Sequence, residues 1–237
     1  MIQYDVCVCS LCYNEIDLLP AWYRRIKQFA KGLAILDTGS NDGSIEFIQH
    51  MKDRGEMDIT LVVDPTDNFH GNFWREITRS IELSNKTWTL RFEPDMFPSP
   101  EFDVILPDLL KEKYIYYFYR KHIISLDPFL VYDRSFPRPF LFPTEWNMKF
   151  KPLGVHQGNV FEDHNHPIKT VSGFEIWHVG EARDCTHVRD KEVRYEKLGP
   201  TELTSKWNKE LRQKRIDRCP HANVIHGTDR RILEMLI

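Results

Sequence analysis

The chain has 237 residues, of which 41% are hydrophobic and 28% are charged, and its formal net charge is −3. These values are ordinary for a soluble globular protein with a sizeable core, and the small net charge gives no sign of a polyanionic partner. No apolar run reaches the roughly 18 residues of a membrane span, and the first residues lack the pattern of a secretion signal. We therefore expect a cytoplasmic protein, in the host cytoplasm if the protein is viral.

Strands and helices are predicted to alternate over the first 95 residues. The predicted strands are short, apolar runs, and the segments between them carry apolar residues at helical spacing. Strands are expected at 4–13, 32–37, 58–63 and 87–92, and helices at 15–29, 44–55 and 72–85. This alternation predicts a largely parallel sheet with helices on both faces.

The pattern changes after residue 100. Segments 113–126 and 128–134 are rich in aromatic and β-branched residues and predict two antiparallel strands. Residues 135–160 are rich in Pro and aromatic residues and carry few helical signals, and 174–180 predicts one more strand. The second part of the chain is therefore expected to add an antiparallel excursion to the parallel sheet.

Two amphipathic helices are expected near the C-terminus, at 189–199 and 202–216. The second overlaps a basic segment, 206–218, that contains one Trp. Such a segment either follows the phosphates of a nucleic acid or is the solvated face of an amphipathic helix. Both interpretations stay open at this point.

The five cysteines do not suit a closed set of disulfides, because their number is odd. Cys7, Cys9 and Cys12 have a spacing that resembles a zinc motif. The first two lie inside an apolar run with strand character, where a free cysteine behaves as a small buried hydrophobic residue. We expect buried thiols rather than a metal cluster.

Acidic residues follow each of the first four predicted strands. They are Glu15, Asp37, Asp64 and the pair Glu93 and Asp95. In open α/β sheets, ligands bind outside the carboxyl ends of the strands, so these acids are expected at a binding site. Clustered carboxylates repel one another and a diphosphate, and a divalent cation relieves that repulsion. Glu93 and Asp95 are thus candidate ligands of Mn²⁺ or Mg²⁺, unless they are merely two exposed loop acids.

The loop after the second strand reads "DTGSNDGS", residues 37–44. Asp37 at its start is placed to accept hydrogen bonds from a ribose hydroxyl or a base. The loop also offers backbone donors and the start of a helix that Ser40, Asn41 or Asp42 can cap. A capped turn without a ligand explains these residues equally well. No Lys follows the glycines, so the loop is not a Walker-type phosphate loop.

Several segments occur together in a fixed order: "CSLCYNEIDLLPAWYRRI", "GLAILDTGSNDGSIEFI" and "FHGNFWREITRSIELSNKTWTLRFEPDMF". Fainter ones follow, "RPFLF…WNMKFKPLGVHQ" and "IWHVGEARD…KEVRYEKL". The ordered set, over about residues 4–200, resembles family 2 glycosyltransferases of the GT-A fold. The resemblance implies an α/β fold with a mixed, mostly parallel central sheet, helices on both faces, an antiparallel excursion and C-terminal helices.

The chain has no repeats and no low-complexity linker, so the simplest architecture is one domain over 1–237. A nucleotide-sugar-binding half would cover about 1–97, an acceptor-shaping half about 98–200, and a helical extension 201–237. The implied nucleotide-sugar residues are Leu11, Tyr13, Asn14, Glu15, Asp37, Ser40, Asp42, Arg75, Glu93 and Arg194. The implied metal ligands are Asp95, Glu93 and His178.

Two departures from the family pattern affect the expected chemistry. Glu93 stands where the family has Asp, and its longer side chain can still reach a metal. Gln157 follows His156 where the family often has a Glu, and an amide has no useful basicity. The candidates for a catalytic base are therefore His156, Glu145, Asp163 and Glu162.

The sequence favours a glycosyltransferase that uses a nucleoside-diphosphate sugar and Mn²⁺ or Mg²⁺. Its acceptor is left open among a surface glycan, a lipid-linked sugar, a protein, a small molecule and a modified DNA base, as are its sugar, its stereochemical outcome and its oligomeric state. A nucleotidyltransferase is disfavoured because the loop after the first strand has no Gly and no Lys. A nucleotide-sugar-binding protein without catalysis is the third hypothesis, and Gln157 is its main support.

Overall fold

The computed structural model describes residues 2–65, 73–126, 129–132, 137–151, 161–162 and 164–180. The strands are β1 (Tyr4–Cys12), β2 (Ala30–Asp37), β3 (Asp58–Val63), β4 (Trp88–Arg91), β5 (Met96–Pro98), β6 (Ile115–Leu126), β7 (Phe129–Tyr132), β8 (Arg138–Pro143) and β9 (Ile168–His178). The helices are α1 (Leu19–Ile26), α2 (Ser44–Asp53), α3 (Phe73–Glu82) and α4 (Glu101–Leu109), with a 3₁₀ turn η2 (Thr144–Trp146). The expected C-terminal helices lie outside the described residues.

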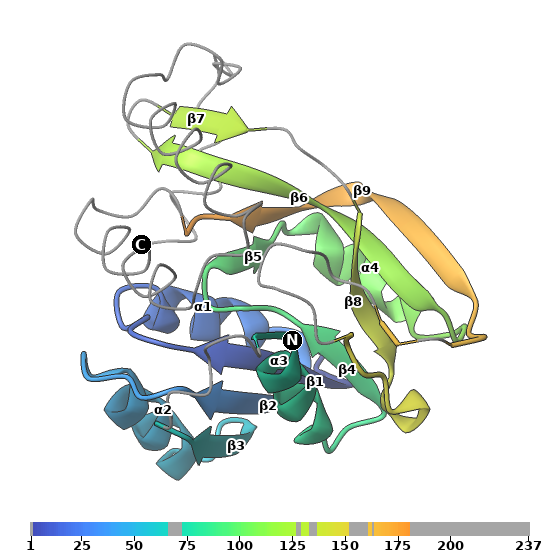
Figure 1. The fold of residues 1–237 in the computed structure, drawn as a ribbon. Helices are drawn as coiled ribbons and strands as arrows, with labels where there is room; N and C mark the ends of the chain where they lie inside the picture. Colours follow the sequence, from blue (N-terminus) through green and yellow to red (C-terminus); the bar gives the residue numbers. More distant parts are fainter. Residues whose placement is uncertain are drawn as a thin grey trace, which may run out of the picture.

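All the strands described belong to one curled sheet, in the order β3-β2-β1-β4-β8-β6-β9-β5, with β7 added on β6 (Figure 1). The first four in this order run parallel, as their alternation with helices predicted. β8 then pairs antiparallel with both β4 and β6, and β6 forms the predicted antiparallel pair with β7. The predicted mixed sheet with a parallel half and an antiparallel excursion is confirmed.

Helices cover both faces of the parallel half. Successive residues of β1 point to opposite faces because the side-chain period of a strand is two. Val6 and Val8 belong to a core shared with α1, α2 and α4, whereas Cys7 and Cys9 belong to a second core that includes residues of α3. The cysteines of β1 are buried and free, so they serve as small core residues, as expected.

The larger core fastens the parallel half to the antiparallel half. Phe118 of β6 stacks on Phe140 of β8 with ring centroids 5.7 Å apart and meets Phe174 of β9 edge-on at 4.8 Å. Phe102 of α4 joins the same cluster, 5.9 Å from Phe92 at the end of β4. These side chains are almost completely buried, and aromatic contacts of this kind add to the hydrophobic stabilisation. The two halves therefore cannot separate without exposing this cluster.

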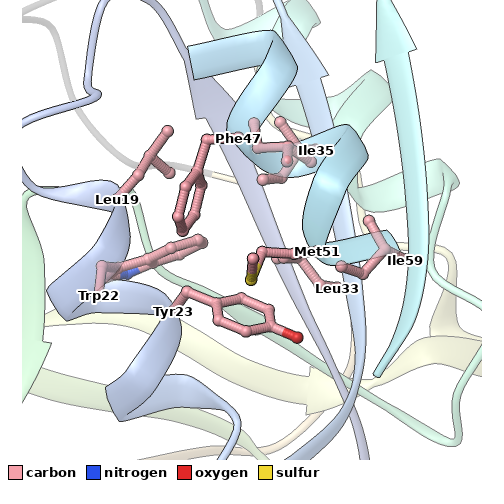
Figure 2. A pocket seen from close by; sticks show the side chains of 9 residues that line it. Leu19, Trp22, Tyr23, Leu33, Ile35, Phe47, Met51 and Ile59 are labelled. Atoms are coloured by element: carbon pink, nitrogen blue, oxygen red, sulfur yellow. The ribbon is translucent and has the colours of Figure 1, made fainter. Parts of the chain in front are cut away.

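An apolar cluster fills the space between α1, α2 and the sheet (Figure 2). Trp22 and Tyr23 of α1 meet Phe47 and Met51 of α2 over Leu33 of β2. The side chains pack tightly together and leave no room for a nucleotide. This face of the sheet is core, and a ligand site has to lie at the strand ends.

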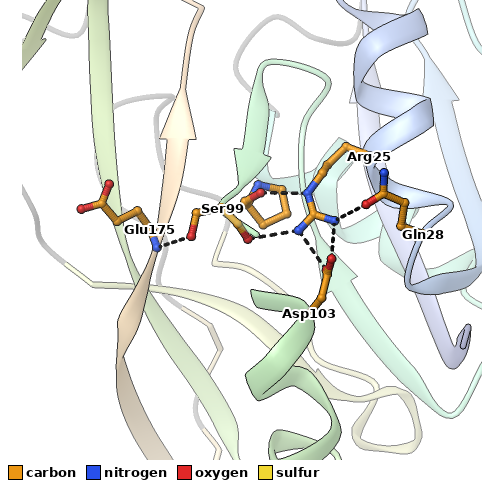
Figure 3. Close-up of polar contacts among 6 residues, drawn as sticks. Arg25, Gln28, Ser99, Asp103 and Glu175 are labelled. Atoms are coloured by element: carbon orange, nitrogen blue, oxygen red, sulfur yellow. Dashed lines mark hydrogen bonds and ion pairs between the residues drawn. The ribbon is translucent and has the colours of Figure 1, made fainter. Parts of the chain in front are cut away.

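Arg25 ties α1 to the segment that follows β5 (Figure 3). Its guanidinium donates to the carbonyl oxygens of Pro98 and Ser99, to both carboxylate oxygens of Asp103 and to Gln28. The Ser99 hydroxyl in turn accepts from the backbone N–H of Glu175 in β9, at 3.2 Å. One buried side chain thus connects α1 directly to Asp103 of α4, and also to Ser99, which is itself bonded to β9.

Two features of the fold differ from the sequence-based expectations. α1 is shorter than predicted, because residues 15–18 form a turn in which the carbonyl oxygen of Glu15 accepts from the N–H groups of Leu18 and Leu19. α4, β5 and β8 were not predicted. Within the part of the chain that the structure describes, no helix is long and apolar enough to cross a membrane.

Candidate functional site

The carboxyl ends of the parallel strands meet at one edge of the sheet. Cys12 at the end of β1 pairs with Asp37 at the end of β2, and Asp37 pairs with Val63 at the end of β3. The acids that follow these strands are therefore neighbours, as predicted. This edge is the candidate site. It is built from the loops after β1 and β2 and from the turn between β4 and β5.

The loop after β2 is organised around the carboxylate of Asp37. Oδ1 accepts from the backbone N–H groups of Gly39 and Ser40, at 2.9 and 2.7 Å, and Oδ2 accepts from the Ser40 hydroxyl at 2.6 Å. The side chain is fully buried. Gly39 has φ +100°, and a side chain there would crowd Pro65. In this conformation Asp37 shapes the loop, and a nucleoside would meet the loop surface rather than the carboxylate itself.

Asp42 and Ser44 join this loop to the loop after β1. Oδ2 of Asp42 accepts from the backbone N–H of Ile16 at 3.0 Å, and its Oδ1 accepts from the hydroxyl and N–H of Ser44. The Ser44 hydroxyl oxygen accepts from the N–H of Glu15. Burial alone would raise the pKa of Asp42, but the hydrogen bonds from Ser44 and Ile16 outweigh it and lower that pKa.

Asn14 completes the connection between the two loops. Its φ of 53° is unusual for a residue other than Gly, but Asn adopts this left-handed conformation more readily than most side chains. The Asn14 N–H donates to the Ser40 hydroxyl oxygen, and its side-chain oxygen accepts from the N–H of Asn41, both at 2.9 Å. Tyr13 beside it is half-buried, so the pair of loops presents an aromatic and amide surface at the sheet edge.

Asp95 and His178 form the second part of the site. Asp95 lies in the turn between β4 and β5, and β5 pairs with the end of β9, so that Met96 is the partner of His178. Asp95 Oδ2 is 3.2 Å from His178 Nε2, and both side chains are largely buried. Gly180 lies against the same carboxylate, because a Cβ at this position would be 2.4 Å from Asp95 Oδ2. The segment His178–Gly180 is therefore fitted to Asp95.

His122 of β6 is a third member that the sequence analysis missed. β6 and β9 run parallel with His122 opposite His178, and their Nδ1 atoms are 3.1 Å apart. One of the two Nδ1 atoms must carry the proton and donate it, and the other must be unprotonated and accept. The contact therefore couples the tautomers of the two rings. A lone His in an apolar strand gave no spacing signal from which its position could be inferred.

Glu93 has a different partner from the one expected. Its Oε1 accepts from Nε and Nη2 of Arg91, whereas Oε2 is buried and accepts no hydrogen bond from the described residues. The structure therefore compensates this carboxylate with a buried Arg. Within the described residues no three His, Cys, Asp or Glu side chains gather as a metal site, and in this conformation Glu93 is paired with Arg91.

Asp95 and His178 nevertheless fit a divalent cation. Two ligands at about 2.1 Å from an octahedral ion lie about 3 Å apart, close to the observed 3.2 Å. A carboxylate oxygen and an imidazole nitrogen are both suitable donors, and Mg²⁺ commonly takes one or two carboxylates together with substrate phosphates. A site with two protein ligands is therefore chemically reasonable, with the diphosphate supplying further oxygens.

The remaining predicted residues lie elsewhere or outside the description. Leu11 is buried in the smaller core, and Arg75 on α3 is exposed. Glu145 follows β8 and pairs with Lys113. The N–H of the preceding residue, Thr144, donates to the carbonyl oxygen of Thr87 just before β4, so Glu145 lies at the opposite edge of the sheet from Asp95. The structure thus does not bring Glu145 to the site. Three other predicted residues lie outside the described residues: the base candidates His156 and Asp163, and Arg194.

Comparison with solved structures identifies the fold. TarS of S. aureus, residues 1–349, superposes over 76% of this chain and 61% of its own, with a TM-score of 0.54 and 11% identity. Its complex with UDP-GlcNAc superposes over 79% and 61%, with a TM-score of 0.56 and 12% identity. The fold is GT-A.

These similarities concern the fold alone, since the identities are so low. A longer TarS structure matches over 75% of this chain but 37% of its own, with a TM-score of 0.54 and 10% identity. The chain therefore spans less than two thirds of the length of each of these TarS structures. No family model and no curated protein sequence matches the chain.

Proposed function

We propose that this protein is a glycosyltransferase that moves a sugar from a nucleoside-diphosphate sugar to an acceptor hydroxyl, with a divalent cation. The observation that carries the proposal is the Asp95–His178 pair at the carboxyl edge of a GT-A sheet, next to the joined loops after β1 and β2. The similarity to TarS, of which one structure holds UDP-GlcNAc, supports a UDP-sugar as the first donor to test.

Asp95 and His178 would hold Mn²⁺ or Mg²⁺. The bound ion would neutralise charge on the departing diphosphate, which is usually a large electrostatic contribution to transfer of this kind. Asp95 supplies the negative charge, and Gly180 lets the carboxylate lie close to the chain that carries His178. Glu93 would act through its pairing with Arg91, which keeps it apart from these two ligands.

The joined loops would hold the nucleoside. Asn14 and Ser40 fix the surface that the base and ribose would meet, and Asp37 and Asp42 fix the backbone beneath it. In this proposal Asp37 and Asp42 position the loops. The backbone groups of the loops and the side chain of Tyr13 contact the nucleoside. Glu15 and Arg75 remain candidates for polar contacts to ribose and phosphate. The acceptor stays open among a glycan, a lipid-linked sugar and a modified DNA base.

The test is turnover of UDP-, GDP- and dTDP-sugars with Mn²⁺, followed as release of the nucleoside diphosphate. Asp95→Ala and His178→Ala should each lower transfer and donor hydrolysis by about 10²-fold or more, since they remove stabilisation of the leaving group. His50→Ala is the matched control, because His50 is exposed on α2. Unchanged turnover in Asp95→Ala would rule out the cation site.

A nucleotide-sugar-binding protein without catalysis is the alternative. The tight compensation of Glu93 by Arg91 favours it, since it leaves fewer acids for a cation. Thermal stabilisation by a UDP-sugar without release of UDP, over a panel of acceptors, would support binding alone.

A further inference from the structure

Three arginines from three neighbouring strands lie within electrostatic reach of one another, and one of them, Arg120, also lies within reach of Asp95. Arg91 lies on β4, Arg138 on β8 and Arg120 on β6, and these strands are consecutive in the sheet. Arg138 is the direct partner of Phe118 on β6, two residues before Arg120. The sheet order, rather than the chain order, therefore brings the three cationic side chains to one place.

Arg120 also lies next to the Asp95–His178 pair. It is the partner of Ile176 on β9, and two residues further along the same pair of strands His122 is the partner of His178. Residues two apart on a strand share a face and are about 7 Å apart. The charge of Arg120 interacts with those of Glu93 and Asp95, and also with those of Arg91 and Arg138.

The arginines differ in how they are compensated. Arg91 is committed to Glu93 through two hydrogen bonds to one carboxylate oxygen. Among the described residues, neither Arg120 nor Arg138 makes a hydrogen bond or a direct ion pair, although both are partly buried. Burial lowers the pKa of both guanidinium groups, and Glu93 and Asp95 only partly offset this for Arg120. The group as a whole has three positive and two negative side chains, so it carries an excess of one positive charge.

We propose that Arg120 and Arg138 form a binding site for a phosphate group beside Asp95. A guanidinium presents planar, forked donors that match phosphate oxygens, and a partly buried guanidinium without a partner is unfavourable until an anion supplies one. Arg91 and Glu93 form the wall of the site and keep the remaining charge positive. The phosphate belongs either to the donor diphosphate or to a phosphorylated acceptor. That choice rests on the proposed function, but the site itself does not.

The first experiment measures inorganic pyrophosphate binding to the full chain by calorimetry, with a chelator present and ionic strength held constant with chloride. Arg120→Gln and Arg138→Gln should each weaken binding at least about tenfold. Arg24→Gln is the control, because Arg24 is exposed on α1, and it should leave binding unchanged. Absence of pyrophosphate binding in the wild type, or equal binding in all variants, would overturn the proposal.

A stability measurement guards against variants that only perturb the fold. Without ligand, Arg120→Gln and Arg138→Gln should keep or raise the melting temperature, because each removes a poorly compensated buried charge. Pyrophosphate should raise the melting temperature of the wild type and not that of these variants. If both variants melt well below the wild type in the absence of ligand, the arginines are structural and the phosphate site is wrong.

Competition with UDP distinguishes the two sources of phosphate. If the site holds the donor diphosphate, UDP displaces pyrophosphate, and Arg120→Gln weakens UDP but not uridine. If the site holds an acceptor phosphate, pyrophosphate still binds when UDP is saturating, and UDP affinity is unchanged in both variants. Either result supports a phosphate site, and neither requires sugar transfer to be observed.

Discussion

Replacing Arg25 with Ala should be one of the most costly single substitutions in the protein. The side chain is 4% exposed and makes the hydrogen bonds drawn in Figure 3 to Pro98, Ser99, Asp103 and Gln28. Asp103 is 39% exposed and regains water when Arg25 is removed, so its loss is small. The carbonyl oxygen of Pro98 lies in a buried segment and loses the donor that Arg25 supplies, whereas that of Ser99 keeps the N–H of Phe102 as a donor.

The magnitude follows from the Pro98 carbonyl group and from the lost ion pair with Asp103. Each buried acceptor left without a donor costs about 1–3 kcal/mol, and the lost packing on Phe29 adds to this. We expect Arg25→Ala to lower the free energy of unfolding by about 4 kcal/mol, within the range for breaking a buried ion pair. Arg25→Lys should recover only part of this, because an ammonium group cannot reproduce the forked geometry.

Urea unfolding followed by tryptophan fluorescence measures this effect, with equal slopes required for a direct comparison. Arg24→Ala is the matched control, one residue away on α1 and exposed, and should change stability by less than about 0.5 kcal/mol. If Arg25→Ala costs no more than the Arg24 control, the hydrogen bonds of Arg25 do not stabilise the fold as argued.

Two further predictions concern the loops and the Asp95–His178 pair. Because the pKa of Asp42 is lowered on folding, its carboxylate stabilises the folded state at pH values above 3.8, the ordinary pKa of Asp. This stabilisation is lost as the pH falls through the lowered pKa of the folded state. Asp42→Asn should therefore lower the free energy of unfolding by roughly 1–3 kcal/mol at pH 6, with the difference from wild type narrowing below pH 4; a constant difference would contradict this. His122→Phe keeps a ring beside His178 but removes the hydrogen bond, and should weaken Mn²⁺ binding in the presence of UDP by roughly 10–100-fold, measured from free Mn²⁺ by electron paramagnetic resonance. An affinity equal to that of the His50→Phe control would show that His122 does not position His178.

The parallel half of the sheet could be predicted because its signals are local. Each strand is a short apolar run, and each connection carries its own helical pattern, so β1 to β4 follow from the sequence. The rest depends on distant contacts. α4 begins after Pro100 and contains Pro107, β5 has three residues, and β8 has Pro at both ends of its apolar run. Proline-rich segments of this kind form regular structure only when neighbouring strands hold them.

The candidate site shows the same division. Asp95 and His178 were expected together because the family resemblance gives both residues a role, and the structure places them in contact. His122 and Arg120 could not have been found in this way, since β6 meets β9 only after more than forty intervening residues. Glu145 was expected near the site from its sequence position, but the antiparallel direction of β8 carries it to the opposite edge.

The joined loops have a consequence for the thermodynamics of ligand binding. Asn14, Ser40 and Asp42 hold the loops after β1 and β2 together through hydrogen bonds made within the protein. The conformational entropy cost of ordering these loops is thus incurred during folding. A ligand that binds the loops does not have to order them again. Binding of a nucleoside at this edge should therefore leave the amide hydrogen exchange of residues 13–16 and 38–44 nearly unchanged.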